Sequence, residues 1–322
     1  MKPKHYLIKV LISGLICCFL FVSLVSFQMG SPTESSRWIY EINTIKLRIA
    51  KSTASPKLII VSGSSGLFGI SCQMIQQETN FPCVNGANHL GLDIDYILDF
   101  SRNLASEGDI ILMPLEYGVY QYDGKLSDVL IDYVFARDPG YITSRNLITQ
   151  LHLFGGISFI RISRGIIGKF RPPTQRTFGY QSTTINEYGD ETNNREADIT
   201  PSQVRRVASE NPISGLVEGG SVNSTTGMKL ISEFVTWCHN NNIQVLATWP
   251  STIYFEEYNQ SGAEIYLQSI KDFYQSIKVP VLGNPRNFMY DHSWFYDTRY
   301  HLHDRGTRQN TKKIIDLLQP YL

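Results

Sequence analysis

Residues 57–69 read KLIIVSGSSGLFG, and this stretch decides the fold. A β-branched run ends in the small residues GSSG at 63–66 and passes directly into a helical pattern. Such a strand-to-helix turn is typical of parallel α/β sheets, which bind their ligands at the carboxyl ends of the strands. The turn is therefore predicted to place the hydroxyl of Ser65 and nearby backbone N–H groups at one edge of a sheet.

Four further β-like runs follow, and amphipathic helical patterns separate most of them. The predicted strands are residues 58–61, 83–85, 109–113, 244–248 and 279–282, and the predicted helices are residues 66–77, 91–105, 227–241, 263–277 and 307–318. Strands that alternate with helices imply a parallel sheet with right-handed crossovers. The sequence thus predicts an α/β three-layer sandwich with a five-stranded, mostly parallel, flavodoxin-like sheet.

The N-terminus has the character of a membrane segment. Residues 10–27 carry no charge and follow three lysines, and about 18 such residues are the lower limit for crossing a bilayer. Because positive flanking charge stays in the cytoplasm, we expect residues 1–29 to be a single-pass anchor in a bacterial cytoplasmic (inner) membrane. The rest of the chain would lie outside the cytoplasm, in the periplasm of a Gram-negative source. A cleaved signal peptide is the alternative, although no clear small-x-small cleavage site follows the span.

Residues 30–56 are expected to be a juxtamembrane linker, and residues 57–322 the α/β domain. The alternation breaks at about 118–226, which is too long for a simple connection and predicts an insertion. Between residues 139 and 185, six basic and no acidic residues interleave with apolar ones. Contact with anionic lipid or a membrane partner is one interpretation. A helical cap on the sheet with a solvated basic edge is the preferred one.

Charge and cysteine content exclude several classes of function. The chain has 29 basic and 29 acidic residues, and no zinc-ligand spacing or basic-aromatic pattern, so we predict no nucleic-acid partner and no metal. Five cysteines do not make a disulfide scaffold at this length. Cys17 and Cys18 lie in the apolar span. A bridge between Cys72 and Cys83 fits an oxidising compartment, but buried free thiols, Cys238 included, are the preferred interpretation.

Serine is a nucleophile only where a base removes its proton and donors stabilise the oxyanion. Ser65 is the best placed, with Ser64 and Ser62 as rivals, and a serine that only caps the helix is the structural alternative. A base with its orienting acid is available near the C-terminus. His301 is the expected base and Asp297 its partner.

Three other residues near these blocks remain open as alternatives. His303 and Asp304 form a rival base and acid immediately after His301. His89 follows the second predicted strand, so it is a lesser candidate for the same pocket.

The order of these blocks resembles SGNH hydrolases: Ser65 after the first strand, residues 85–91 after the second, residues 115–117 after the third, and Asp297 with His301 at the end. The chain is most similar to the membrane-anchored branch that acylates the cell envelope, such as the D-alanyl transfer protein of teichoic acids and alginate O-acetylation proteins. The resemblance covers most of residues 57–318 apart from the insertion.

The resemblance implies the roles of nucleophile, base and acid for Ser65, His301 and Asp297. It also implies a set of oxyanion- or substrate-binding candidates, which are Asn85, Gly86, Ala87, Asn88, Glu116 and Tyr117. The usual Asn of the third block is missing, and Glu116 stands there. A carboxylate donates no hydrogen bond unless it is protonated, so Glu116 is expected to position a substrate or the loop. The acid and base are also one residue further apart than in the common DxxH, which leaves the identity of the acid open.

The function implied is an extracytoplasmic serine acyltransferase that O-acetylates or otherwise O-acylates a cell-envelope or secreted polysaccharide without a cofactor. Its partners would be an acyl donor, a polysaccharide acceptor and a membrane-bound O-acyltransferase. A carbohydrate esterase or deacylase with the same triad is one alternative. A non-catalytic polysaccharide-binding or assembly protein on a degenerate SGNH scaffold is the other, motivated by the missing Asn.

Overall fold

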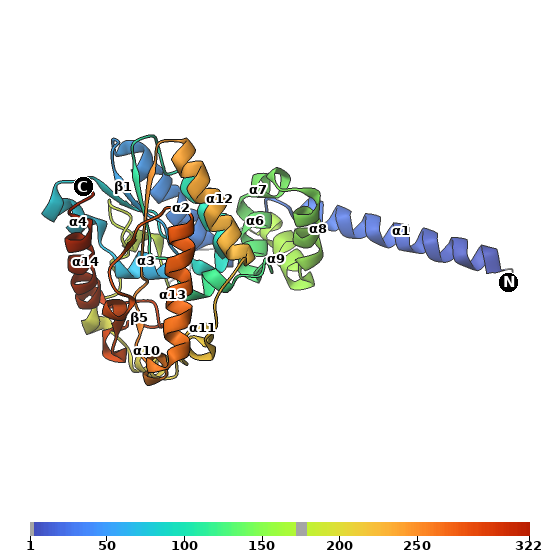
Figure 1. Cartoon of the computed structure of the whole chain (residues 1–322). Helices are drawn as coiled ribbons and strands as arrows, with labels where there is room; N and C mark the ends of the chain where they lie inside the picture. Colours follow the sequence, from blue (N-terminus) through green and yellow to red (C-terminus); the bar gives the residue numbers. More distant parts are fainter. Residues whose placement is uncertain (1–2, 172–178) are drawn as a thin grey trace. The chain divides into compact units, whose positions relative to one another are not determined.

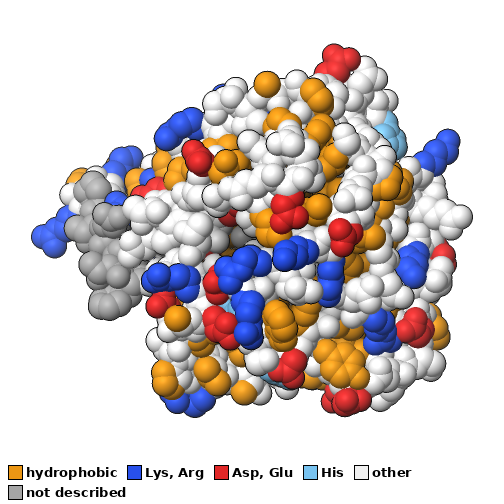
Figure 2. Space-filling view, turned by 90° about the vertical axis from the view of Figure 1, so that its left-hand side faces the viewer, with side chains coloured by type: hydrophobic (Ala, Val, Ile, Leu, Met, Phe, Trp, Pro, Cys, Tyr) orange, Lys and Arg blue, Asp and Glu red, His pale blue; other side chains and the backbone are white. Residues whose placement is uncertain are grey.

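A computed structural model describes residues 3–171 and 179–322 (Figure 1). The chain divides into two compact units. Residues 41–125 and 180–322 form the α/β unit, and residues 1–40 and 126–179 form the second, which we call the N-terminal unit. On the face of the molecule shown in Figure 2, basic side chains lie among acidic ones, as the balanced composition leads one to expect.

A five-stranded parallel sheet forms the centre of the α/β unit. Its strands are β1 (Leu58–Ile60), β2 (Cys83–Asn85), β3 (Ile110–Met113), β4 (Gln244–Thr248) and β6 (Val281–Leu282), in the order β2-β1-β3-β4-β6. In the register, Ile59 lies between Val84 and Ile111. This is the flavodoxin-like order of doubly wound sheets. The predicted fold class and all five predicted strands are confirmed, with boundary shifts of one or two residues.

Helices flank this sheet and bury its strands. The helices of the unit are α3 (Ser64–Gly69), α4 (Cys72–Thr79), α5 (Asp93–Arg102), α10 (Pro201–Ala208), α11 (Ser214–Glu218), α12 (Thr226–Asn240), α13 (Ser261–Ser276) and α14 (Asp304–Leu318). Contacts join α5 to α12, and α14 to both α3 and α4. A second, two-stranded parallel sheet consists of β5 (Thr252–Ile253) and β7 (Met289–Tyr290). All of β1 and β3 is buried, as expected for parallel strands covered on both faces.

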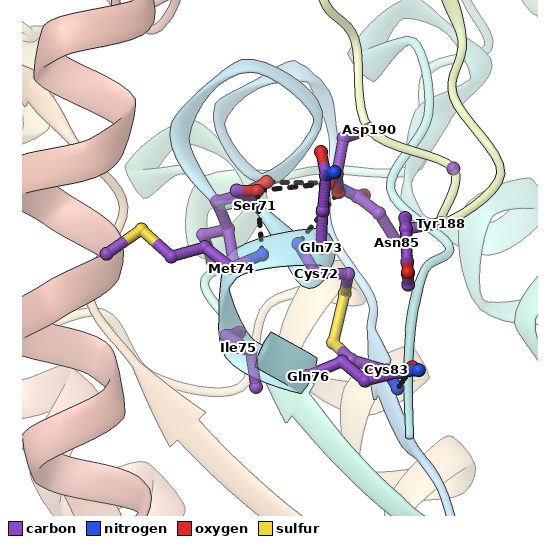
Figure 3. The surroundings of a disulfide bond; sticks show 12 residues. Ser71, Cys72, Gln73, Met74, Ile75, Gln76, Cys83, Asn85, Tyr188 and Asp190 are labelled. Carbon is purple, nitrogen blue, oxygen red and sulfur yellow. Dashed lines mark hydrogen bonds between the residues drawn. A yellow bond between two sulfur atoms is a disulfide. The ribbon is translucent and has the colours of Figure 1, made fainter. Parts of the chain in front are cut away.

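The predicted helix at residues 66–77 is broken in the structure. Ile70 is extended, and Ser71 caps a new helix by accepting the N–H of Met74. Asp190, from a distant loop, accepts hydrogen bonds from Ser71 Oγ and from the N–H of Cys72 at 3.1 and 2.8 Å (Figure 3). A carboxylate at a helix N-terminus satisfies free N–H groups, so this partner sets where α4 begins.

A disulfide joins Cys72, the first residue of α4, to Cys83, the first residue of β2 (Figure 3). The preferred interpretation of these two cysteines as free thiols was therefore wrong. The break before α4 brings the two Cα atoms to 5.0 Å, within the usual disulfide range. Cys238 is a buried free thiol, and Cys17 and Cys18 are free.

The N-terminal unit begins with α1 (Pro3–Gln28), the one helix among the described residues that is long and apolar enough to cross a membrane. A signal sequence has the same character. The predicted linker at 30–56 is largely helical, because α2 occupies Glu34–Ser52. The part of α2 from residue 41 onward, with the buried Lys46, belongs to the α/β unit.

The inserted segment supplies the rest of the N-terminal unit. Its helices are α6 (Asp128–Arg137), α7 (Pro139–Ser144), α8 (Leu147–Gly156) and α9 (Phe159–Phe170). Each begins at a capping side chain that accepts an N–H three residues later, namely Ser127, Asp138, Asn146 and Ser158. Only residues 126–179 of the predicted 118–226 insertion leave the α/β unit. These helices form one compact unit with residues 1–40.

Candidate active site

The serine turn lies at the carboxyl end of β1, where α3 begins. Ser65 is buried, and its Oγ lies 3.1 Å from both Pro114 O and Ser62 Oγ. Its backbone N–H donates to Glu116 Oε1 at 2.8 Å, and the N–H of Gly63 donates to Oε2 at 3.1 Å. The Ser65 hydroxyl therefore points into a buried polar cluster beneath the turn.

Glu116 holds this turn in place. Burial raises the pKa of its carboxyl group, and the N–H donors of Ser65 and Gly63 oppose that shift. The fit is close, because a Cβ atom added at Gly63 would lie 2.5 Å from Glu116 Oε1. Of the two roles expected for Glu116, the structure shows the positioning of the loop.

His301 and Asp297 form a hydrogen-bonded pair with 2.7 Å between Nδ1 and Oδ1. Tyr180 OH donates to the other carboxylate oxygen and lies 3.0 Å from Nδ1. Burial acts to raise the pKa of Asp297, but the hydrogen bonds from His301 and Tyr180 and the positive charge of Arg206 lower it below its ordinary value. An ionised carboxylate beside Nδ1 favours the tautomer with the proton on Nδ1, which makes Nε2 the basic nitrogen.

Phe68 connects this pair to the serine turn. The His301 ring stacks on the Phe68 ring with 4.0 Å between centroids and 11° between planes. Phe68 follows Ser64 by four residues and Ser65 by three on α3, and residues at these spacings are neighbours on a helix surface. Phe68 thus joins the His301–Asp297 pair to the helix that begins with Ser64 and Ser65.

No hydrogen bond joins either serine to His301 among residues 3–171 and 179–322, and Nε2 accepts none there. Ser64 is half-buried, and within the same described residues its hydroxyl has no hydrogen-bond partner. The Ser65 hydroxyl is thus engaged with Ser62 and Pro114 and not with His301.

The Asn85 amide ties together the elements around the turn. Its Nδ2 donates to Gly66 O at 3.2 Å, to Ile70 O at 3.0 Å and to Asp190 Oδ1 at 3.2 Å. Figure 3 shows Asn85 and Asp190 side by side near the disulfide. Asn85 therefore stabilises the break between α3 and α4, and its side-chain N–H donors already have hydrogen-bond partners.

The other second-block candidates also make internal contacts. The N–H of Ala87 donates to Asn85 Oδ1 at 3.2 Å, and Asn88 Nδ2 donates to Asn43 Oδ1. Gly86 packs closely, because an added Cβ would lie 2.9 Å from Ile60 O. In this conformation, these side chains and amides support the loop.

The remaining candidates differ in their placement. Tyr117 is fully buried beside Trp249 and Tyr266, away from the surface of the site. Burial, and after it the charge of His301, lower the pKa of His89.

His303 and Asp304 serve the start of α14 and not the chemistry. His303 Nδ1 accepts the N–H of Gly306 at 3.2 Å as the helix cap, and its Nε2 lies 3.0 Å from Ser293 O. Asp304 accepts the N–H of Glu196 at 2.9 Å. Both residues are occupied, so they leave His301 and Asp297 as the candidate base and acid.

Sequence reasoning missed Phe68, Tyr180 and Lys46. Phe68 stands at helical spacing from the serines, which is a signal that was available. Tyr180 follows the inserted segment in the sequence, so no local motif connects it with the predicted site. Lys46 is fully buried and donates to Asn85 O at 2.6 Å and to Gly189 O at 2.9 Å. Its position on a predicted linker gave no reason to expect it near the site.

The pH dependence of stability tests the role of Lys46. Burial lowers the pKa of Lys46 to about 7, against the charges of Asp190 and Glu191. Because the unfolded chain keeps its ordinary pKa near 10.5, it binds more protons than the native state between pH 7 and 10.5. The free energy of unfolding therefore rises with pH across this window. The contribution of Lys46 to it is lost as pH falls toward 7.

We expect the unfolding free energy of wild type, measured against Lys46→Met, to gain roughly 2 kcal/mol between pH 7.5 and 9.5. Urea unfolding of both proteins at the two pH values measures this difference. The exposed Lys229→Met variant is the control and should show a pH-independent difference. If the difference in unfolding free energy between wild type and Lys46→Met is the same at both pH values, burial does not lower the pKa of this amine.

Comparisons with known proteins add no homologue. Protein-family models give no match to the chain, and the curated proteins give none either. Within residues 3–171 and 179–322, no group of three or more His, Cys, Asp or Glu side chains is arranged to hold a metal ion. The chemistry of the site is therefore inferred from its own residues.

Proposed function

We propose that this chain is a membrane-anchored, extracytoplasmic serine acyltransferase that O-acetylates or otherwise O-acylates a cell-envelope or secreted polysaccharide. The observation that carries the proposal is the His301–Asp297 pair stacked on Phe68 of α3, the helix that begins with Ser64 and Ser65. An oriented imidazole beside a serine turn at the carboxyl end of a parallel strand is the arrangement that acyl transfer requires.

In the proposed reaction, Ser65 Oγ rotates from Pro114 O toward His301 Nε2 and attacks the carbonyl carbon of an acyl donor. The proton passes to Nε2 and then to the leaving group, so an ester forms on Ser65. His301 next takes the proton of a sugar hydroxyl, whose oxygen attacks the acyl carbon. The bond between that carbon and Ser65 Oγ breaks, and Nε2 returns the proton to Oγ, so the acylated sugar leaves and the serine is regenerated. The N–H of Ser65 is the nearest oxyanion donor once Glu116 shifts away from it.

Two features support a location outside the cytoplasm. The apolar helix α1 has the length of a membrane span, and the Cys72–Cys83 disulfide belongs to an oxidising compartment. The polysaccharide acceptor and a membrane-bound O-acyltransferase as the donor-side partner follow from the resemblance to envelope acylation proteins. A deacylase would use the same residues with water in place of the sugar hydroxyl.

A non-catalytic polysaccharide-binding or assembly protein is the second candidate, and one observation favours it. Glu116 occupies the N–H groups of both Gly63 and Ser65, and the Ser65 hydroxyl points toward Pro114. A carboxylate that fills the oxyanion position permanently would leave the serine without catalysis.

Labelling of the full-length protein with a fluorophosphonate probe separates these candidates. We expect wild type to be labelled, with the adduct on Ser65 by peptide mass spectrometry, because an activated serine reacts with such probes. Ser65→Ala should lose the label, and the matched control Ser64→Ala should keep it. An adduct on Ser64 would transfer the role of nucleophile to that residue. Absence of labelling in all three proteins would favour the non-catalytic candidate.

Product analysis separates transfer from hydrolysis. Purified protein is incubated with an acetyl ester donor and a neutral oligosaccharide, and the sugar is examined by mass spectrometry. A transferase yields acetylated sugar in a Ser65-dependent manner. Release of acetate without sugar modification would instead indicate the deacylase.

A further inference from the structure

Helices α8 and α9 expose an unusual number of large apolar side chains. Six of them, which we call the α8–α9 patch, are between 62% and 81% exposed: Leu147, Ile148, Leu151, Phe159, Ile160 and Phe170. Single apolar residues at a surface are ordinary, but a group on two consecutive helices marks an interaction site. Exposure of this much apolar surface to water is unfavourable.

Helix α9, which follows α8 in the chain, is fixed to the end of α1. Lys169 Nζ donates to Phe27 O at 2.7 Å and lies 4.3 Å above the Phe27 ring, and the rings of Phe27 and Phe170 are 6.4 Å apart. Arg161 donates to Gln28 Oε1 at 2.6 Å. Phe27 and Gln28 are the last residues of α1. The α8–α9 patch therefore lies where a spanning α1 would leave the bilayer.

Positive charge accompanies the patch. Arg164, Lys169 and Arg171 are exposed on or just after α9, and residues 139–171 contain no acidic side chain. Arg164 and Arg171 line a groove of about 300 Å³ beside the start of α2, and Glu34 also lines it. Cations at the edge of an apolar helical face are the composition of segments that lie in the interface of anionic membranes.

We propose that the α8–α9 patch inserts into the membrane interface next to α1, with Arg164 and Arg171 contacting the phosphates of anionic phospholipids. The inference rests on the proposed function in one respect, that α1 spans the membrane. A bilayer is favoured over a second copy of the chain because the patch continues the exposed apolar surface of α1 through the contacts at Phe27. The N-terminal unit then has two attachments to the membrane.

Photocrosslinking of the full-length chain tests this docking. Benzoylphenylalanine is placed at Phe159, at Leu15 inside α1, or at Val204 on α10, an exposed apolar control in the α/β unit. Each protein is reconstituted in vesicles of phosphatidylethanolamine and phosphatidylglycerol at 3:1 and irradiated. We expect phospholipid adducts at positions 159 and 15 and none at 204.

The outcomes separate this inference from the proposed anchor. Lipid adducts at Leu15 with no adduct at Phe159, or with a crosslinked dimer there, would overturn the docking while the anchor stands. Loss of lipid adducts at both positions would overturn both.

A charge variant provides a second readout. Arg164→Gln combined with Arg171→Gln should lower the lipid adduct at Phe159 several-fold in the anionic vesicles and leave it unchanged in phosphatidylcholine vesicles. An equal yield in the two proteins in anionic vesicles would overturn the phosphate contact.

Discussion

Replacing His301 by alanine is expected to lower the rate of acyl transfer by about a thousandfold or more, the scale seen when the base of a serine triad is removed. In the proposed reaction its Nε2 accepts the serine proton, and two other histidines, His303 and His89, are engaged elsewhere. His303 is committed to the cap of α14, and His89 Nδ1 accepts the N–H of Gly91 at 2.9 Å. Hydrolysis of an activated acetyl ester by the full-length protein measures the change.

His152→Ala is the matched control, because this histidine is exposed on α8. It should retain the wild-type rate. Asp297→Asn should also be strongly impaired, and combining it with His301→Ala should cost little more than His301→Ala alone, since residues of a triad act as one unit. Equal rates for wild type and His301→Ala would remove this imidazole from the chemistry.

Asp109→Ala is expected to lower the free energy of unfolding by about 3–5 kcal/mol, the cost of leaving one member of a buried ion pair without its partner. Lys57 Nζ lies 2.7 Å from Asp109 Oδ2, and both side chains are buried. Asp109 also accepts the backbone N–H groups of Lys57 and Ser106 at 3.1 and 2.8 Å. These residues stand at the amino ends of β1 and β3, so the loss affects the sheet edge opposite the serine turn.

Chemical denaturation followed by tryptophan fluorescence measures this change. The control is Asp198→Ala, which breaks a pair of the same 2.7 Å length between Arg195 and Asp198 that is 68% and 44% exposed. Exposed pairs contribute about 0–1 kcal/mol, so the control should unfold close to wild type. Similar losses in the two variants would show that burial does not determine the strength of these pairs.

The sequence predicted the sheet well, because each strand is a local apolar run between helical patterns, and the strand order of such alternation is restricted. It predicted the His301–Asp297 pair for a similar reason, since acid and base lie four residues apart. The break between α3 and α4 could not be predicted from the local sequence. It depends on Asp190, which is more than a hundred residues away from Ser71.

The hydrogen bonds that occupy the oxyanion candidates could not be predicted from the sequence either. Whether the N–H of Ser65 is free depends on where the Glu116 side chain turns, and only tertiary packing decides that. The same holds for the Asn85 amide, whose partners come from two segments, α3 with its C-cap and the distant loop of Asp190. Candidate residues carried by local motifs could therefore be named from the sequence, while their hydrogen bonds and the distant residues Tyr180 and Lys46 could not.

The Cys72–Cys83 bond makes a covalent ring of residues 72–83 that encloses all of α4. Closing a ring of this size removes roughly 3 kcal/mol of chain entropy from the unfolded state. Thiol buffers of the cytoplasm keep such rings open. Given the proposed location outside the cytoplasm, the newly synthesised chain is thus less stable before it crosses the membrane than after it, which favours completion of folding on the far side.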